Sequence, residues 1–175
     1  MTVLRSFALV LALGALAACG SKAPPPTTTP TTDPVPAAAK ILVNVDDEGT
    51  ALLGFDSVAY HADQKASPGS GDNAVAHGGA NYWFATPDSK AKFAAEPAKF
   101  APHYGGYCAY AMAQGRLSPV QPEVFGIYES QLLLFTNPEF KKLFDADVAK
   151  HKAAADQNWP KLVEQHGKPA PASAP

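Results

Sequence analysis

The residues best suited to chemistry in this 175-residue chain gather around Cys108. Met112 follows the cysteine by four residues, which places both side chains on one face of a helix, and His103 precedes the cysteine by five. A thiolate, a thioether and an imidazole together form a ligand set that suits Cu(I). The spacing therefore predicts a soft transition-metal site, with copper as the first candidate, formed by Cys108, His103 and Met112.

Two further histidines are weaker candidates for the same site. His77 ends a short strand-like run and His61 follows a capped turn, and both regions are expected to pack near Cys108. A purely structural or exposed position for these two histidines stays open as an alternative, because a lone histidine is commonly structural or exposed. Met112 can equally be core filler and Cys108 a small buried hydrophobic residue, since both residue types are common in protein cores.

Cys108 could also act without a metal. With Gly106 as a cap, the cysteine would lie in the first turn of a helix, where free amide donors favour the thiolate. Redox chemistry would need an external thiol, because the only other cysteine, Cys19, is expected to carry a lipid. A cysteine hydrolase would need a base and an orienting acid, for example His103 or His61 with Asp56, but Asp56 is better placed as a helix cap.

Clear start signals position helices on both sides of the cysteine. Thr86-Pro87 and Asn137-Pro138 each combine a capping side chain with a proline in the first helical position. The first helix is expected to end before Pro97, which starts a further short turn. The second is expected to run through Ala154, and a last helix is expected around Trp159.

Two hairpins complete the predicted fold. Residues 74–84 turn at Gly78-Gly79, a pair that supplies the positive backbone angles of a tight turn, and residues 124–135 turn at Glu129-Ser130. Residues 41–45 read as an edge strand or an extended lead-in. The fold class predicted is α+β, with small antiparallel β-hairpins covered by several helices in a single domain.

The N-terminus predicts export. Arg5 precedes an apolar run, residues 7–18, that is too short to cross a bilayer and is typical of a secretory signal. The run ends in LAACG, which resembles the lipobox of bacterial lipoproteins, whose cysteine is diacylated with chains such as palmitate. This resemblance makes residues 1–18 a lipoprotein signal peptide and Cys19 a lipid anchor; an ordinary signal peptide is the alternative. Gly20 and Ser21 resemble a signal for the outer membrane, with the domain facing the periplasm.

Composition sets the remaining boundaries. Residues 19–39 are rich in proline, threonine and alanine and cannot bury enough apolar surface to fold, so they are expected to form a disordered tether. Residues 40–166 have the length of one domain. Residues 167–175 repeat the composition of the tether and are expected to be a disordered tail.

The charge excludes one class of partner. The formal net charge is -2, and the chain has no cluster of lysines and arginines that could follow a phosphate backbone. We therefore expect no nucleic acid among its partners and a membrane contact through the lipid on Cys19. The sequence names no protein partner.

Three motifs in order resemble the YHS domain-containing proteins, and more narrowly a lipid-anchored subgroup with cysteine or selenocysteine after a Tyr-Gly-Gly-Tyr segment. The motifs are GFDSVAY at residues 54–60, YGGYCAY at 104–110 and ADQNWP at 155–160. Several such domains occur beside heavy-metal transporters, with a cysteine pair thought to hold a metal. Here Tyr60-His61 is followed by Ala62 and the cysteine pair is absent, so the resemblance does not supply a multi-thiolate site.

Three functions remain open from the sequence. The first is an envelope lipoprotein that binds a soft metal at or near Cys108 without catalysis. The second is a thiol redox protein that acts through Cys108 without metal. The third is an envelope interaction module in which the cysteine is inert.

Overall fold

The structure is a computed structural model that describes residues 39–170 of the chain. The predicted signal peptide, Cys19 and residues 20–38 of the predicted tether lie outside the described residues, as do residues 171–175. Among residues 39–170, none of the helices has both the length and the apolar composition that a membrane span requires.

The first hairpin forms where the sequence predicts it. Strand β2 (Ser70–His77) pairs antiparallel with β3 (Ala80–Phe84), and the turn places Gly78 and Gly79 at φ angles of 56° and 80°. Such angles match the twist of a hairpin, and glycine adopts them at little cost. Alternate residues of β3 are buried, so one face of the hairpin packs against the core.

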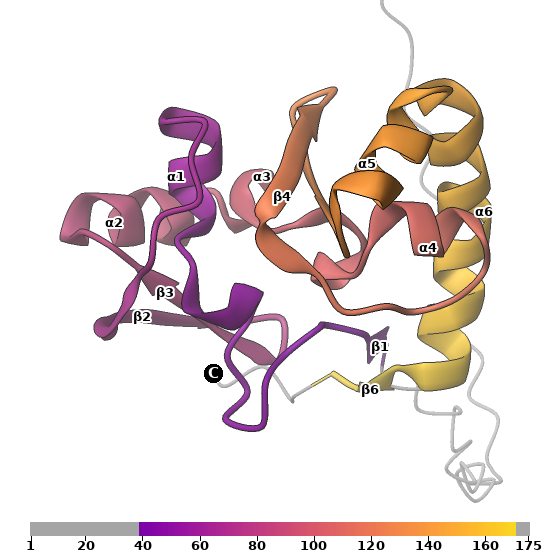
Figure 1. The fold of residues 1–175 in the computed structure, drawn as a ribbon. Helices are drawn as coiled ribbons and strands as arrows, with labels where there is room; N and C mark the ends of the chain where they lie inside the picture. The colour runs from indigo at the N-terminus through magenta and orange to yellow at the C-terminus, as the bar shows by residue number, and fades with distance from the viewer. Residues whose placement is uncertain (1–38, 171–175) are drawn as a thin grey trace, which may run out of the picture. The chain divides into compact units, whose positions relative to one another are not determined.

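Three helices accompany this hairpin. Helices α1 (Ser57–Ala62) and α2 (Pro87–Ala95) lie against it, and α3 (Pro97–Phe100) follows α2 directly (Figure 1). The predicted start of α2 is confirmed, because the amide of Ser89 donates to the hydroxyl of Thr86 at 3.1 Å. A proline begins both α2 and α3, which also confirms the predicted interruption.

The second hairpin lies at the core of the part of the domain that the remaining helices form. Strand β4 (Gln121–Tyr128) pairs with β5 (Gln131–Phe135), and the turn residues Glu129 and Ser130 have φ angles of 49° and 64°. Residues 132–135 of β5 are all buried, which confirms the burial on both faces that their continuous apolar character predicts.

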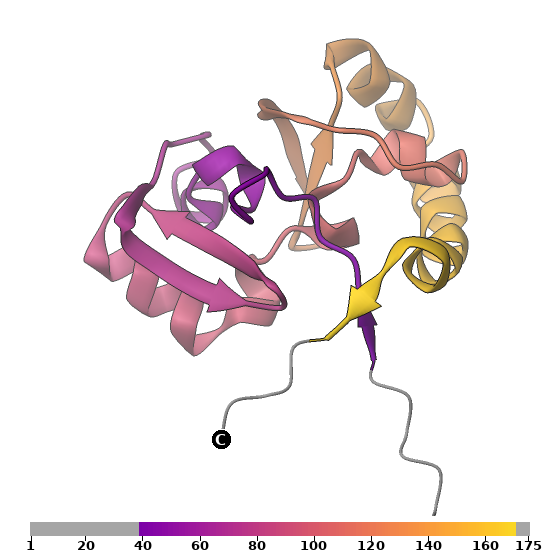
Figure 2. The same ribbon diagram turned by 90° about the horizontal axis from the view of Figure 1, so that it is seen from below.

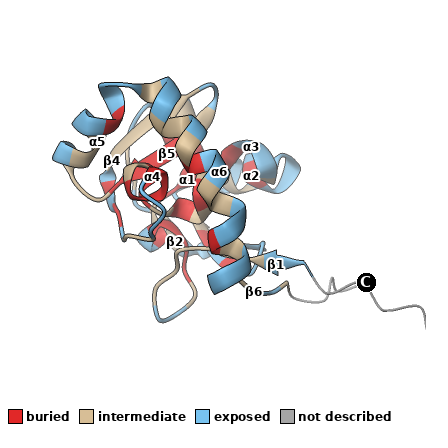
Figure 3. Ribbon diagram, turned by 90° about the vertical axis from the view of Figure 1, so that its right-hand side faces the viewer, coloured by how far each residue is buried: buried red, intermediate tan, exposed pale blue. Residues whose placement is uncertain are grey.

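Helices α4 (Ala109–Ala113) and α5 (Pro138–Asp145) contact β5, and the long helix α6 (Val148–His166) contacts α4 and α5. Figure 3 shows buried residues concentrated on α4 and β5, whereas α5 and α2 carry many exposed residues. The second hairpin and α4 therefore form the interior of this part of the domain.

One predicted helix boundary is wrong. The sequence predicts a helix from Pro138 through Ala154 and a separate last helix, but the chain breaks at Asp147 and α6 then continues through Pro160. Asp147 caps α6 by accepting the amide of Lys150 at 3.1 Å. The internal proline is tolerated because α6 has an exposed face, where a carbonyl that loses its amide partner can bind water.

The predicted disorder of residues 167–175 is wrong for the first residues of that segment. Lys168–Pro169 forms strand β6, which pairs antiparallel with β1 (Lys40–Ile41), and the amide of Ala170 donates to the carbonyl of Ala39 at 2.8 Å. The pairing satisfies the backbone of a lead-in strand that otherwise has a free edge. In Figure 2 the two ends of the described chain accordingly lie side by side.

These elements confirm the predicted α+β class. The described residues contain three two-stranded antiparallel sheets, six α-helices and two 3-10 helices, η1 (Leu52–Gly54) and η2 (His103–Gly106). One hydrophobic cluster includes buried residues from both hairpins and from α4. The two hairpins therefore share a single core.

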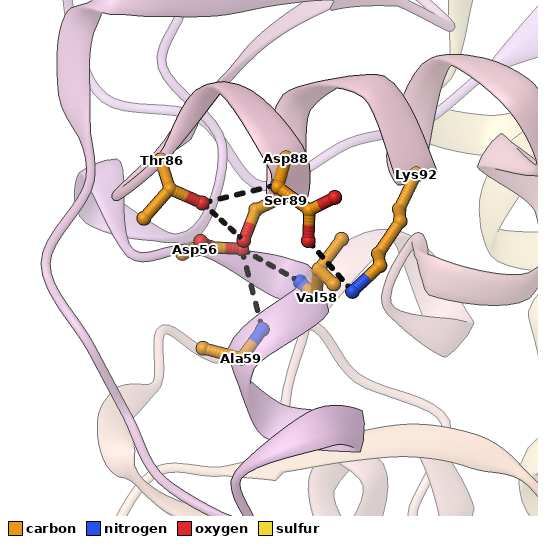
Figure 4. A network of polar contacts seen from close by, with 7 residues as sticks. All are labelled: Asp56, Val58, Ala59, Thr86, Asp88, Ser89 and Lys92. Carbon is orange, nitrogen blue, oxygen red and sulfur yellow. Dashed lines mark hydrogen bonds and ion pairs between the residues drawn. The ribbon is translucent and has the colours of Figure 1, made fainter.

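A buried carboxylate links α1 to the first hairpin. Asp56 is completely buried, and its Oδ1 accepts the amides of Val58 and Ala59 at 2.8 and 3.3 Å (Figure 4). Its Oδ2 accepts the amide of Ala85, just after β3, at 3.0 Å. The predicted cap is confirmed, and the second oxygen joins two elements that lie 29 residues apart.

Replacing Asp56→Asn should destabilise the domain by about 2–3 kcal/mol, because an amide NH₂ would face a backbone N–H that now has a carboxylate oxygen as its acceptor. Urea unfolding followed by tryptophan fluorescence measures the change. The control is Asp63→Asn, at the exposed C-terminal end of α1, which should change stability by less than about 0.5 kcal/mol. Equal stability of the two variants would contradict this role for Asp56.

Candidate functional site

Cys108 lies in the core and not on an accessible helix turn. Its exposed fraction is 0%, and it is the residue that precedes α4, so the predicted cap at Gly106 is wrong. Gly105 and Gly106, at φ angles of 59° and 79°, instead form part of η2, and the helix begins only at Ala109. The expectation that Cys108 lies in the first turn of its helix is therefore wrong, and its thiol is not accessible.

The backbone of Cys108 is bonded on both sides. Its amide donates to the carbonyl of Ser118 at 3.2 Å, and its carbonyl accepts the amide of Met112 at 2.9 Å. The residue also forms a parallel bridge with Leu134 in the buried strand β5. These contacts fix the cysteine between α4 and the second hairpin.

Met112 shares this environment. Its exposed fraction is also 0%, and it belongs to the same hydrophobic cluster as Cys108. Asn158 on α6 donates to the carbonyl of Met112 at 3.1 Å and to that of Ala113 at 3.3 Å, which satisfies the C-terminal end of α4. Cys108 and Met112 are therefore both buried core residues, as in the alternative interpretation that gives neither of them a metal-binding role.

The three candidate histidines contact different partners. His103 packs on the ring of Tyr104, while His61 meets the ring of Phe100 edge-on, with ring centroids 5.5 Å apart. His77 lies near the rings of two residues of the first hairpin and α2. Within residues 39–170, no group of three or more histidine, cysteine, aspartate or glutamate side chains is placed to hold a metal ion.

His103 belongs to a cluster of polar side chains, two of which lie on α6. The hydroxyl of Tyr104 donates to Oδ1 of Asp156 at 2.7 Å, Lys152 donates to Oδ2 at 3.0 Å, and Nε2 of His103 lies 3.6 Å from Oδ1. Lys152 also lies 3.7 Å from Glu129 in the second turn. We call Tyr104, His103, Lys152 and Asp156 the α6 cluster.

The electrostatics of the α6 cluster favour an ionised Asp156 that is paired with Lys152. Burial raises the pKa of Tyr104, and its hydrogen bond to Asp156 raises it further. Burial alone would raise the pKa of Asp156, but the hydrogen bonds from Tyr104 and Lys152 outweigh it and hold this pKa below its usual value. Burial lowers the pKa of His103, and Asp156 opposes this only in part. The cluster therefore holds a neutral tyrosine and an ionised aspartate.

Sequence reasoning missed Asp156 and Lys152 as members of a cluster. Asp156 lies in the ADQNWP segment, but no local pattern connects it with Tyr104, 52 residues earlier. The pairing depends on how α6 packs, so only the structure shows it.

The Tyr-Gly-Gly segment is held on its other side by residues 42–44, an extended stretch that follows β1. The amide of Asn44 donates to the carbonyl of Gly105 at 2.8 Å, and a Cβ atom on Gly105 would lie 2.1 Å from the carbonyl oxygen of Leu42. Tyr104 has a left-handed φ of 51°, and its ring lies 6.1 Å from the ring of Trp159 between centroids. The segment therefore acts as a structural connection between residues 42–44 and α6.

Replacing Gly105→Ala should destabilise the domain by about 3 kcal/mol or more, since a left-handed alanine is strained and its Cβ would overlap a backbone oxygen. The matched control is Gly78→Ala, which has a similar φ of 56° but open space around the added Cβ. The control should cost only about 1–2 kcal/mol. Thermal or urea unfolding of both variants measures the difference, and equal losses would contradict the close approach at Leu42.

Acidification tests the surroundings of His61. Burial lowers the pKa of His61 below its usual 6.5, and the nearby Lys99 lowers it further. The unfolded chain therefore takes up this proton more readily, so the full stability is present above 6.5 and is lost as the pH falls toward the lower folded pKa. Between about pH 7.5 and about pH 5.5, the wild type should lose more unfolding free energy than His61→Gln. The same loss in both proteins would show that His61 is not shielded.

Comparisons of the chain with family models, with curated proteins and with solved structures find no match. The similarity to YHS domain-containing proteins therefore stays a prediction from the three motifs. A functional proposal has to rest on the residues of this chain.

Proposed function

We propose that the domain is a non-catalytic binding module, held at the cell envelope by a lipid on Cys19, in which Cys108 is a structural residue. Of the three functions left open by the sequence, this is the third. The observation that carries the choice is the complete burial of Cys108 between α4 and β5.

Redox chemistry through Cys108 is disfavoured by this burial. Reactive cysteines lie in partly exposed, electropositive surroundings, because the thiolate must reach its substrate. A thiol with an exposed fraction of 0%, in a cluster of aliphatic and aromatic side chains, can react only after the domain opens. The same opening would be needed for copper to enter a site made by Cys108 and Met112.

Hydrolysis is disfavoured as well. Asp56, the acid that such a mechanism would use, already accepts three backbone hydrogen bonds and is completely buried. The rings of His61 and His103, the two candidate bases, pack against the rings of Phe100 and Tyr104, and Nε2 of His103 lies 3.6 Å from Oδ1 of Asp156. The use of Asp56 as a cap disfavours a cysteine hydrolase built on Cys108.

The anchor belongs to the proposal through the sequence alone. The described domain begins about twenty residues after Cys19, so the intervening segment is long enough to separate a folded domain from a lipid surface.

Replacing Cys19→Ser should move the protein from the outer-membrane fraction to the soluble periplasmic fraction. Retention in the membrane would contradict the anchor.

The role of Cys108 is tested with the full-length lipoprotein, purified in detergent under anaerobic conditions. Cu(I) is titrated against a competing chelator for the wild type, Cys108→Ala and Met112→Leu, and glutathione disulfide is added separately without denaturant. We expect no stoichiometric copper and no mixed disulfide in the wild type. Cys108→Ala should remain folded and lose about 1–2 kcal/mol of stability through the lost packing.

Two results would contradict this proposal in different ways. Stoichiometric copper that is lost in Cys108→Ala and weakened in Met112→Leu would support the soft-metal function. A mixed disulfide formed by the folded protein would support the redox function.

A further inference from the structure

A hollow of about 300 Å³ lies between the turn of the first hairpin and the end of α6. Gly79 of that turn and His166, the last residue of α6, both line it. Figure 2 shows the segment after β1 running between these two parts of the domain. The volume lies at the lower end of the range of small-molecule sites, so the hollow has room for a small ligand.

The segment after β1 gives the hollow an apolar wall. Ile41, Val43 and Val45 line it and stand at alternate positions of an extended stretch, so they share one face. Leu117 and Tyr107 line it as well, and all five side chains are only half-buried. The folded chain therefore leaves apolar surface uncovered here, and a ligand that buries this surface gains free energy.

Tyr107 also presents a hydroxyl that the described residues do not use. It makes no hydrogen bond with residues 39–170, whereas the hydroxyls of Tyr60 and Tyr104 each donate to an oxygen atom. The hydroxyl of Tyr107 is not sealed in the core, since the buried side-chain atoms without a partner in this part of the chain belong to other residues: Ser57, His61 and Gln131. It is therefore an accessible donor beside the apolar wall.

The rim of the hollow carries a lysine without an ionic partner. Lys168 lines the hollow, is exposed and forms no ion pair with residues 39–170, whereas Lys40 on the paired strand is bonded to Glu164. None of the described residues that line the hollow is acidic, and His166 adds a second basic group. Asp46, just beyond the apolar wall, accepts two backbone amides of its own turn. The rim therefore disfavours a cation and favours an anion.

These groups define the chemistry of a ligand. A tyrosine hydroxyl and a lysine ammonium both donate hydrogen bonds, so the matching group is an anionic acceptor. One ammonium offsets one negative charge, which a carboxylate carries and a phosphate monoester exceeds. The half-buried aliphatic side chains match an aliphatic body.

We propose that this hollow binds a short aliphatic carboxylate, whose chain lies on Ile41, Val43 and Val45 and whose carboxylate accepts hydrogen bonds from Tyr107 and Lys168. The inference rests on the proposed function, because it names a ligand class for the binding module.

The test uses the full-length lipoprotein in detergent, labelled at tyrosine for NMR, with hexanoate as a probe that stays largely in water. The ring signals of Tyr107, assigned with Tyr107→Phe, should shift saturably, while those of Tyr110, half-buried outside the hollow, should not shift. Butanoate, which is two methylenes shorter, should bind about tenfold more weakly. Hexylamine, which reverses the charge, should bind more weakly than hexanoate as well.

Matched variants make the test specific. Lys168→Gln should weaken hexanoate about threefold, because an exposed charge contributes little energy, and Lys161→Gln, an exposed lysine of α6 outside the hollow, should leave it unchanged. Tyr107→Phe, followed by ligand-detected NMR, should weaken hexanoate about fivefold through the lost hydrogen bond. The urea unfolding transition of each variant shows that it is folded.

Three results would overturn the inference. The first is a linear shift without saturation, and the second is equal binding of hexanoate and hexylamine. The third is unchanged hexanoate binding in Lys168→Gln together with lower stability, because the lysine would then only complement the negative end of α6.

The copper and glutathione experiments on the same protein report separately on Cys108. A failure at the hollow with an unreactive Cys108 removes only the ligand class. A reactive Cys108 removes the proposed structural role and leaves a hexanoate site standing.

Discussion

Burying the segment from Tyr104 to Ala113 is the constraint on which the rest of this structure depends. A buried chain must find a partner for almost every backbone amide and carbonyl. Here the partners come from four separate regions: the segment after β1 at Asn44, the loop at Ser118, the strand β5 and the helix α6 at Asn158. Each region is therefore held in place by the same segment.

This constraint also decides what Cys108 can do. A residue whose amide and carbonyl are both bonded, and whose side chain has no exposed surface, is protected by the same contacts that organise the domain. Exposing its sulfur would disturb α4 and β5 together. The sequence suggests a reactive or metal-binding thiol, whereas the structure buries this thiol in a close-packed core. Because residues of both hairpins share that core, exposing Cys108 would disrupt packing across the whole domain.

The sequence predicts the local features of the fold well. The caps at Thr86, Asn137 and Asp56 and both hairpin turns are confirmed, because each depends on residues only a few positions apart. The break before α6 was missed, since Asp147 competes with a helical pattern that continues on either side of it.

The errors of greater consequence concern long-range contacts. The pairing of Lys168 with Ile41 and the bond between Tyr104 and Asp156 join positions more than fifty residues apart, and no local pattern encodes them. The burial of Cys108 belongs to the same class. Its neighbours in sequence allow both an accessible thiolate and a core residue, and the choice is made by β5 packing against it.

The rate at which Cys108 reacts with an alkylating reagent, measured as a function of urea concentration, tests the central claim most directly. If the thiol is sealed in the core, alkylation in native buffer is slow, and the reactivity rises together with the global unfolding transition. Fast alkylation of the folded protein, at a rate independent of urea below the unfolding transition, would contradict the account and make Cys108 a candidate functional residue again.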